Sequence, residues 1–290
     1  MIVILLSFMM KAQRHEIGYQ FGMSNLIGDI GNTSYVLQHP IYHKFEKRRL
    51  SWYAGILYRM NFNPYQTLRF NIGVSHVEFD DSYAKENYRR FRKLLGSNTI
   101  YESDVIFEYN LFPVNDEQKS LLSPYIFGGI GGMITNIMQA TINHDFNRDI
   151  NGNIINGGPT SPADFVTNET YYGTQQITMS IPFGVGLKYK FNYNWALFGE
   201  FMFRPTFSDA LDYSTISDKN IKVIYNKDIL DPSGKKSLLQ TDPYLNVAKQ
   251  READFIKNRE VGNINSKDWI NSITIGISYS FGRPPCYCEQ

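Results

Sequence analysis

Strict alternation of apolar and polar side chains runs along much of the chain. From Gln176 to Lys190 the odd-numbered positions are apolar, and the even-numbered positions are polar, small or proline. Successive side chains of a β-strand point to opposite faces, whereas a helix would repeat its apolar positions every three or four residues. The pattern therefore predicts strands with one apolar face and one polar face.

Seven further segments share this period and bring the expected number of strands to eight. The cleanest are residues 16–24 and 273–281, and the glycine-rich segment 123–134 is the one whose faces the pattern does not assign. The remaining segments are residues 52–60, 68–74, 105–111 and 195–207.

The connections between these segments alternate in length. Short connections cover residues 61–66, 112–122 and 192–194, and long ones cover residues 25–51, 76–100, 135–175 and 208–271. Barrels of the bacterial outer membrane have an even strand number, short periplasmic turns and long external loops. The sequence therefore predicts an all-β protein, an eight-stranded antiparallel transmembrane β-barrel with short periplasmic turns, long extracellular loops and both termini in the periplasm.

A soluble up-and-down barrel of the lipocalin type is the alternative, because it shows the same alternation with its apolar side chains inside. Three features favour the membrane barrel. Its polar face is rich in small residues that fit a narrow interior, and its loops are markedly unequal. Its apolar face also ends in aromatic residues such as Trp52, Tyr109, Trp195 and Tyr279, as interfacial girdles do.

If the polar face points inward, the interior receives five acidic and four basic side chains. Eight strands enclose a space that side chains alone can fill, and charges buried there must be paired and hydrogen-bonded. We therefore expect a polar plug and no open pore. Glu200 and Arg204 lie about 13 Å apart along one strand, so each is expected to pair with other strands. The nine residues are Glu16, Arg59, Arg69, Glu102, Asp104, Glu108, Lys188, Glu200 and Arg204.

The two ends of the chain differ from this pattern. Residues 1–13 resemble the hydrophobic part of a secretory signal peptide, truncated at its start because the usual basic leader is missing. We expect the barrel to occupy residues 14–282 and a short periplasmic tail to occupy 283–290. The tail carries the chain's two cysteines, Cys286 and Cys288. Because they are poorly placed to bridge each other, an intermolecular disulfide and free thiols are the alternatives.

Composition and motifs exclude several classes of function. With 29 basic and 28 acidic residues, the chain has a net charge close to zero, which does not favour binding to nucleic acid. Its five histidines fall at strand ends or in loops, and we find no catalytic constellation, metal site or cofactor motif. The sequence therefore predicts a protein that is not an enzyme and has no cofactor.

Two loop segments have helical character. Residues 88–95 are basic and amphipathic, which suits contact with lipopolysaccharide phosphates or a neighbouring protein, and a solvated helix face is the alternative. Residues 247–259 mix charged and apolar side chains and suggest a short helix in the longest loop.

A series of short strings resembles the PorG family of Bacteroidota outer-membrane barrels in order and spacing. The Phe62-Asn63-Pro64 turn and the late Asp268-Trp269 pair are the most distinctive of them. The others are residues 15–18, 27–31, 124–131, 181–186 and 204–209.

The resemblance implies a structural component of the type IX secretion system in the outer membrane. Such proteins associate with a periplasmic ring built by the lipoprotein PorK and its partner PorN, so PorK-like and PorN-like proteins are the implied partners, beside outer-membrane lipid and lipopolysaccharide. The cysteine tail is a compatible attachment point for such a partner. The alternative, from another class, is a ligand-binding or adhesive surface barrel that uses its long extracellular loops.

Overall fold

The computed structural model describes residues 14–32, 50–115, 121–146, 150, 165–225, 249–250, 253–255, 261–263 and 266–282. The expected signal peptide (1–13) and the tail with Cys286 and Cys288 lie outside these residues. None of the helices in the described ranges is long and apolar enough to cross a membrane.

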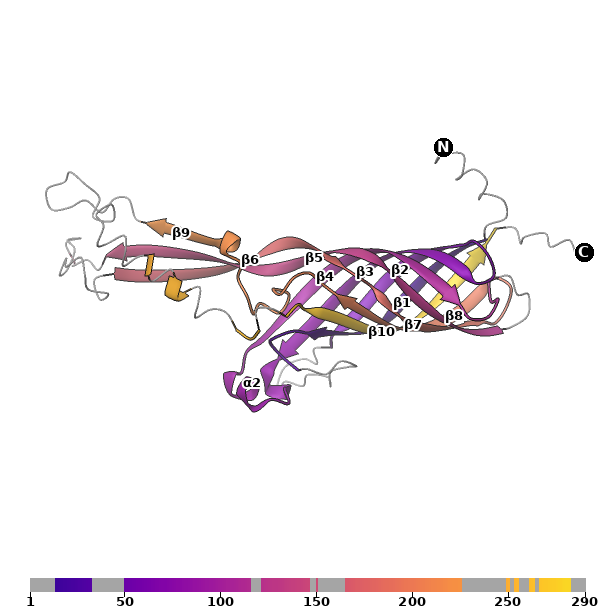
Figure 1. The fold of residues 1–290 in the computed structure, drawn as a ribbon, viewed down its shortest axis with the longest axis horizontal. Coiled ribbons are helices and arrows are strands. Elements are labelled where there is room, and N and C mark those ends of the chain that lie inside the picture. Colours follow the sequence, from indigo (N-terminus) through magenta and orange to yellow (C-terminus); the bar gives the residue numbers. More distant parts are fainter. Residues whose placement is uncertain are drawn as a thin grey trace, which may run out of the picture. The chain divides into compact units, whose positions relative to one another are not determined.

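Eight strands form a closed antiparallel ring, in the order β4-β3-β2-β1-β10-β8-β7-β5 and back to β4 (Figure 1). The eight-stranded barrel predicted from the alternation is thereby confirmed. Their bounds are β1 Arg14–Ile27, β2 Trp52–Asn61, β3 Gln66–Asp80, β4 Leu95–Asn110, β5 Leu121–Phe146, β7 Phe183–Lys190, β8 Trp195–Pro205 and β10 Trp269–Phe281.

Two further strands lie outside the ring. Strand β6, Phe165–Ser180, pairs with β5, and β9, Ile221–Tyr225, pairs with β5 in parallel. The short helices with defined bounds are η1 Asp81–Tyr83, α2 Asn87–Arg92 and η3 Asp218–Asn220.

The chain divides into two compact units. Unit 1 holds the ring and comprises residues 1–136, 175–212 and 265–290, and unit 2 comprises residues 137–174 and 213–264. Unit 2 has a small core of its own, in which Ile142 and Ile216 pack with Phe255. Residues 253–255 are helical, within the short helix expected at 247–259.

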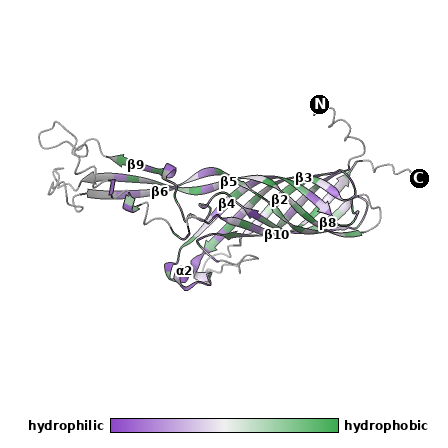
Figure 2. Cartoon of the chain, viewed as in Figure 1, coloured by the Kyte–Doolittle hydropathy of each residue, from purple (hydrophilic) through white to green (hydrophobic). Residues whose placement is uncertain are grey.

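Hydropathy alternates along the strands of the ring (Figure 2), and the exposed fractions show that the apolar side chains point outward and the polar ones inward. On β1, Tyr19 and Phe21 are more than 60% exposed, whereas Glu16 and Gln20 are 3% exposed. This arrangement contradicts the lipocalin alternative, which requires an apolar interior.

The segment 176–190 is two strands and not the single strand that its alternation predicts. Strand β6 ends at Ser180 and β7 begins at Phe183. Pro182 has no N–H group to donate to a ladder, so regular pairing stops there. The backbone nevertheless stays attached on both sides, since Ile181 N donates to Pro205 O at 3.1 Å and Gly129 N donates to Pro182 O at 2.8 Å.

Two of the predicted long loops include parts of strands. Within 76–100, β3 continues to Asp80 and pairs with β4 from Leu95 onward. Within 135–175, β5 continues to Phe146 and β6 begins at Phe165. The prediction failed there because backbone pairing continues after the apolar face has ended, so the alternation that marks a strand disappears while the ladder does not.

The connections fall at two ends of the ring, which we call the turn end and the loop end. The turn end carries the connections around residues 62–65 and 191–194, beside the start of β1 and the end of β10. There the Asn63 and Asn192 carboxamides each accept hydrogen bonds from two following backbone N–H groups at 2.8–2.9 Å, which fixes tight turns. The loop end carries residues 28–32, η1 and α2.

Candidate functional site

The interior of the ring brings together all nine charged side chains that the sequence directs inward. Each is at most 3% exposed. They come from six different strands, and their positions follow from the period of two along each strand. They are Glu16, Arg59, Arg69, Glu102, Asp104, Glu108, Lys188, Glu200 and Arg204.

Two arginines and two glutamates form the centre of this network. Arg59 Nε donates to both carboxylate oxygens of Glu108 at 3.0 Å, and its Nη2 lies 3.2 Å from Glu200 Oε1. Arg69 Nη1 lies 2.8 Å from Glu108 Oε1 and also contacts Glu200. Tyr125 adds its hydroxyl, which donates to Glu200 Oε1 at 2.5 Å. Two positive and two negative groups thus neutralise each other in the middle of the ring.

Toward the turn end, Glu16 is the next charged residue with several polar contacts. Its carboxylate accepts from the Asn61 amide at 2.9 Å and from the Ser278 hydroxyl at 3.2 Å, and Lys188 Nζ lies 3.7 Å away. Beyond it, Arg14 and Lys190 both donate to the backbone carbonyl of Asn115. Sequence reasoning missed Arg14 and Lys190, although both follow from extending β1 and β7 by one inward position.

Toward the loop end, Arg204 forms a bifurcated pair with Glu102, in which Nη1 lies 2.5 and 2.6 Å from the two carboxylate oxygens. Neighbouring Asp104 is held by the Asn71 amide at 3.1 Å. Glu200 and Arg204 therefore pair with other strands and not with each other, as the 3.3 Å rise along a strand requires.

Aromatic rings pack against the guanidinium groups of this network. The Arg59 guanidinium lies 4.4 Å from the Phe198 ring centroid, and the Arg204 guanidinium lies 4.9 Å from the Tyr53 ring centroid. No group of metal-ligating side chains is present among the described residues. The arrangement can fill the barrel and link its strands, and its paired charges leave no row of like charge for an ion to follow.

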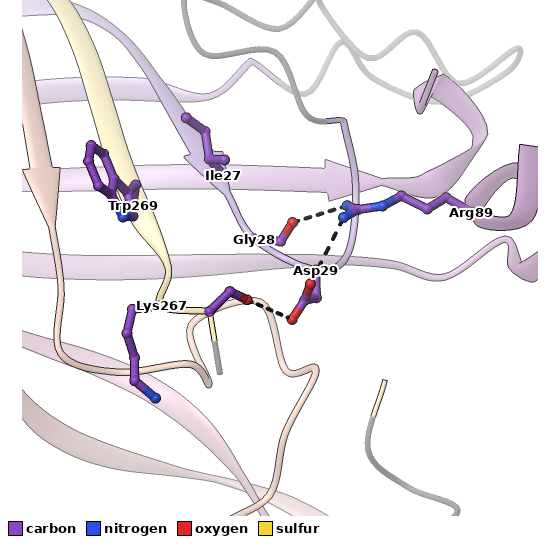
Figure 3. A pocket seen from close by; sticks show the side chains of 7 residues that line it. Ile27, Gly28, Asp29, Arg89, Lys267 and Trp269 are labelled. Atoms are coloured by element: carbon purple, nitrogen blue, oxygen red, sulfur yellow. Dashed lines mark hydrogen bonds and ion pairs between the residues drawn. The ribbon is translucent and has the colours of Figure 1, made fainter. Parts of the chain in front are cut away.

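A cavity of about 450 Å³ lies at the loop end (Figure 3). Its wall includes Gly28, Asp29 and Arg89, which are joined because the Arg89 guanidinium donates to Gly28 O at 3.0 Å and lies 3.9 Å from the Asp29 carboxylate. Ser266 donates its hydroxyl to Asp29 at 3.3 Å. Ile27, Lys267 and Trp269 complete the lining.

The helix α2 is fixed to this end of the ring through Asp81, which is fully buried. The Asp81 carboxylate accepts from Gly31 N at 2.8 Å, from Leu94 N at 3.1 Å and from Arg92 Nε at 2.7 Å. Arg92 also donates to Asp29 O at 2.7 Å. The basic segment predicted at 88–95 thus uses two of its arginines, Arg89 and Arg92, as anchors, a role that periodicity alone does not reveal.

A group of aspartates lies beside this anchor. Burial and then the negative charge of Asp29 raise the pKa of Asp209 to about 6. Burial and the charge of Asp212 raise the pKa of Asp268 well above its ordinary value, although the Leu211 N–H, 2.8 Å from its carboxylate, opposes the shift. Gly28 faces the Asp212 and Asp268 carboxylates so closely that a Cβ there would lie 2.4 and 2.7 Å from their oxygens.

The fold and this site define a class: a closed eight-stranded barrel with an apolar exterior and a charge-paired interior. The chain belongs to the family described as "Domain of unknown function (DUF6089)", which matches residues 1–154 and 242–290. No curated protein sequence matches the chain.

Several solved structures resemble the chain distantly. Ail, the attachment invasion locus protein of Yersinia pestis, is 10% identical over 93% of this chain and 99% of its own, with a TM-score of 0.37. OprG from Pseudomonas aeruginosa is 8% identical over 94% of this chain and 97% of its own, with a TM-score of 0.36. A major outer membrane protein from Thermus thermophilus is 13% identical over 93% of this chain and 100% of its own, with a TM-score of 0.34. At these TM-scores the likeness adds nothing to what the strand pairing itself shows.

Proposed function

We propose that this chain is an outer-membrane β-barrel that acts as a structural anchor and has no enzymatic activity. The observation that carries the proposal is the inside-out distribution of side chains, with paired charges inside and apolar side chains outside. Ile72, Ile177 and Ile275 are each at least 67% exposed, and water is a poor environment for such a surface. A bilayer removes that cost, and a closed ring leaves no unpaired sheet edge in the hydrocarbon.

The direction of insertion follows from the two ends. Barrels of this class keep short turns in the periplasm and long loops outside, so the turn end is assigned to the periplasm and the loop end to the cell surface. The start of β1 and the end of β10 then both face the periplasm. The residues that follow Phe281 would enter the same compartment.

The more specific proposal is that the barrel anchors or organises the PorK/PorN ring of the type IX secretion system at the outer membrane. The ordered resemblance to the PorG family supports it. The plugged interior is compatible with it, because an anchor needs a rigid barrel and no passage. The partners proposed are a PorK-like lipoprotein and a PorN-like ring protein, reached by residues 283–290.

The attachment is tested by non-reducing electrophoresis of membranes and by copurification of ring proteins with the full chain. Wild type should give a higher-mass band that reduction removes, and the variant Cys286→Ser/Cys288→Ser should lose it. The single variants Cys286→Ser and Cys288→Ser are the matched controls that identify the reacting thiol. An unchanged band in the double variant would exclude the covalent link, and unchanged copurification after deletion of residues 283–290 would exclude the tail as the attachment point.

A second candidate function is ligand binding or adhesion by the long loops. The observation that favours it is unit 2, which has its own core and a stacked pair, Tyr171 and Phe255, at 6.2 Å between ring centroids. Deleting residues 218–263 distinguishes the two. Loss of protein export with an intact ring would favour the loops, and unchanged export and ring assembly would favour the anchor.

A further inference from the structure

The outward side of α2 carries exposed aromatic and basic residues together. Tyr88 and Phe91 lie three residues apart on one helix face and are 61% and 84% exposed. Arg90 and Lys93 are exposed beside them. Arg90 donates to the Asn87 side chain of its own helix, and no ion pair involves Arg90 or Lys93 within the described ranges. We call Tyr88, Arg90, Phe91 and Lys93 the α2 patch.

The orientation of the α2 patch is fixed by the residues between its members. Arg89 donates to Gly28 O and Gly31 O at 3.0 and 3.1 Å, and Arg92 is bound to Asp81. Arg89 Nε also donates to the Tyr88 hydroxyl at 3.2 Å, so an anchored arginine positions one member of the patch directly. These buried contacts hold the helix that carries the α2 patch against the ring.

The α2 patch is followed in the chain by an exposed apolar residue at the start of β4. Helix α2 projects beside the loop end and not over its opening (Figure 1). The first residue of β4, Leu95, is 64% exposed and belongs to the same outward row as Tyr101 and Val105, which are 51% and 42% exposed. The outward positions between Leu95 and Tyr101 are the polar residues Ser97 and Thr99. Leu95 is therefore an isolated exposed apolar side chain two residues after Lys93, and the mainly apolar exterior of β4 begins at Tyr101.

We propose that the α2 patch docks onto the phosphate groups of lipids in the leaflet at the loop end. This proposal rests on the proposed membrane barrel. Guanidinium and ammonium groups bind phosphate through charge-assisted hydrogen bonds, and aromatic rings settle at the boundary of headgroups and acyl chains. Arg90 and Lys93 supply the first property, and Tyr88 and Phe91 supply the second. The occupant is thus an anionic lipid surface with exposed phosphate groups, which phosphatidylcholine, a zwitterion, does not provide.

The depth of the α2 patch is measured with spin labels on the full chain in liposomes. In a background of Cys286→Ser and Cys288→Ser, labels are placed at Phe91→Cys, at the exposed loop position Ser82→Cys and on the barrel wall at Ile72→Cys. Phosphatidylcholine liposomes with and without lipid A are compared, using oxygen as the lipid-soluble relaxant and a nickel chelate as the aqueous one. The label at 91 should gain oxygen access and lose nickel access when lipid A is present, whereas the label at 82 should stay in water.

The outcomes separate this proposal from the barrel itself. A label at 91 that remains in water with both lipids, while the label at 72 reports hydrocarbon, overturns lipid docking and leaves the membrane barrel standing. A label at 91 that is immobile and closed to both relaxants indicates a protein occupant and also overturns lipid docking. A label at 72 in water overturns the membrane barrel.

The contribution of charge is tested by titrating lipid A into micelles of the purified chain. Arg90→Gln/Lys93→Gln should raise the apparent dissociation constant roughly 30-fold, since each basic residue near an anionic surface contributes about fivefold. Lys219→Gln/Lys222→Gln in unit 2 removes the same charge and should leave the constant unchanged. Equal losses in the two double variants, or no loss in either, would show that the α2 patch is not the lipid site.

Discussion

Arg59 and Arg69 lie directly opposite each other on β2 and β3, and both guanidinium groups contact the same two carboxylates. Like charges opposite each other on neighbouring strands are normally destabilising. Here Glu108 reaches them from β4, the neighbour of β3, and Glu200 reaches them from β8, which is not adjacent to β2 or β3, so that satisfying the two arginines requires the barrel to be closed. The two arginines are therefore neutralised only when the ring closes.

The first prediction concerns Glu200. The substitution Glu200→Ala leaves two buried guanidinium groups with one carboxylate and should lower the free energy of unfolding by about 3–5 kcal/mol. Adding Arg69→Met should recover part of the loss, because it removes the excess charge. Urea unfolding in lipid vesicles measures both, with Glu169→Ala at an exposed position of β6 as the control. Equal stability of Glu200→Ala and the control would refute the role given to the central network.

The second prediction concerns Gly186. A Cβ at this inward position would lie 2.3 Å from the Tyr125 ring, which is fully buried against Glu200. Gly186→Ala should therefore force Tyr125 to shift and should destabilise the barrel by about 1–3 kcal/mol. Gly132→Ala is the matched control, because nothing lies within 4 Å of a Cβ there. Two variants of equal stability would show that the interior has room that the packing does not suggest.

The ring and the charged residues of its interior could be predicted from the sequence. Alternation fixes which side of a strand each residue faces, so nine inward charges could be named without knowing the strand order. What alternation cannot give is the partner of each charge. Arg204 meets Glu102, which is 102 residues away along the chain, and only the strand order and register bring them together.

The loop end was predicted poorly for a different reason. Asp81, Arg89 and Arg92 carry no periodic signal, because their function is to satisfy backbone groups of another loop. The basic character of residues 88–95 was visible, but its division into anchoring and exposed arginines depends on one buried aspartate. Such contacts are set by tertiary structure and leave no local pattern.

The third prediction concerns that aspartate. Asp81→Ala removes the acceptor of four hydrogen bonds and should release α2 from the rim, so trypsin should cleave after Arg89, Arg90 or Arg92 at least tenfold faster. Glu86→Gln removes the charge of a 3.9 Å pair with Arg89 at a part-exposed position and should leave the rate nearly unchanged. Equal cleavage rates in the two variants would mean that Asp81 does not hold the helix.

The fourth prediction concerns pH. Because the pKa of Asp209 is raised from 3.8 to about 6, the folded loop end binds a proton more tightly than the unfolded segment. This contribution is therefore complete below about pH 3.8 and is lost as pH rises through about 6. Hydrogen exchange of the Leu211 and Ile30 amides should accelerate over this window beyond the intrinsic rise. Asp209→Asn should remove that acceleration, and its persistence in the variant would assign the effect to Asp268 or another group.

The fifth prediction concerns permeability. Paired charges and buried rings fill the interior, so the wild-type chain in planar bilayers should show no steady conductance. Replacing three crossing side chains together, in Arg59→Ala/Arg69→Ala/Glu200→Ala, removes two positive charges and one negative charge and opens space at the centre. That variant should conduct and, because Glu16 and Glu108 then lack their arginine partners, should prefer cations. Glu169→Ala serves again as the control and should show no conductance. A wild-type chain that conducts steadily would show that the network moves aside, and the barrel would then be a channel and not an anchor.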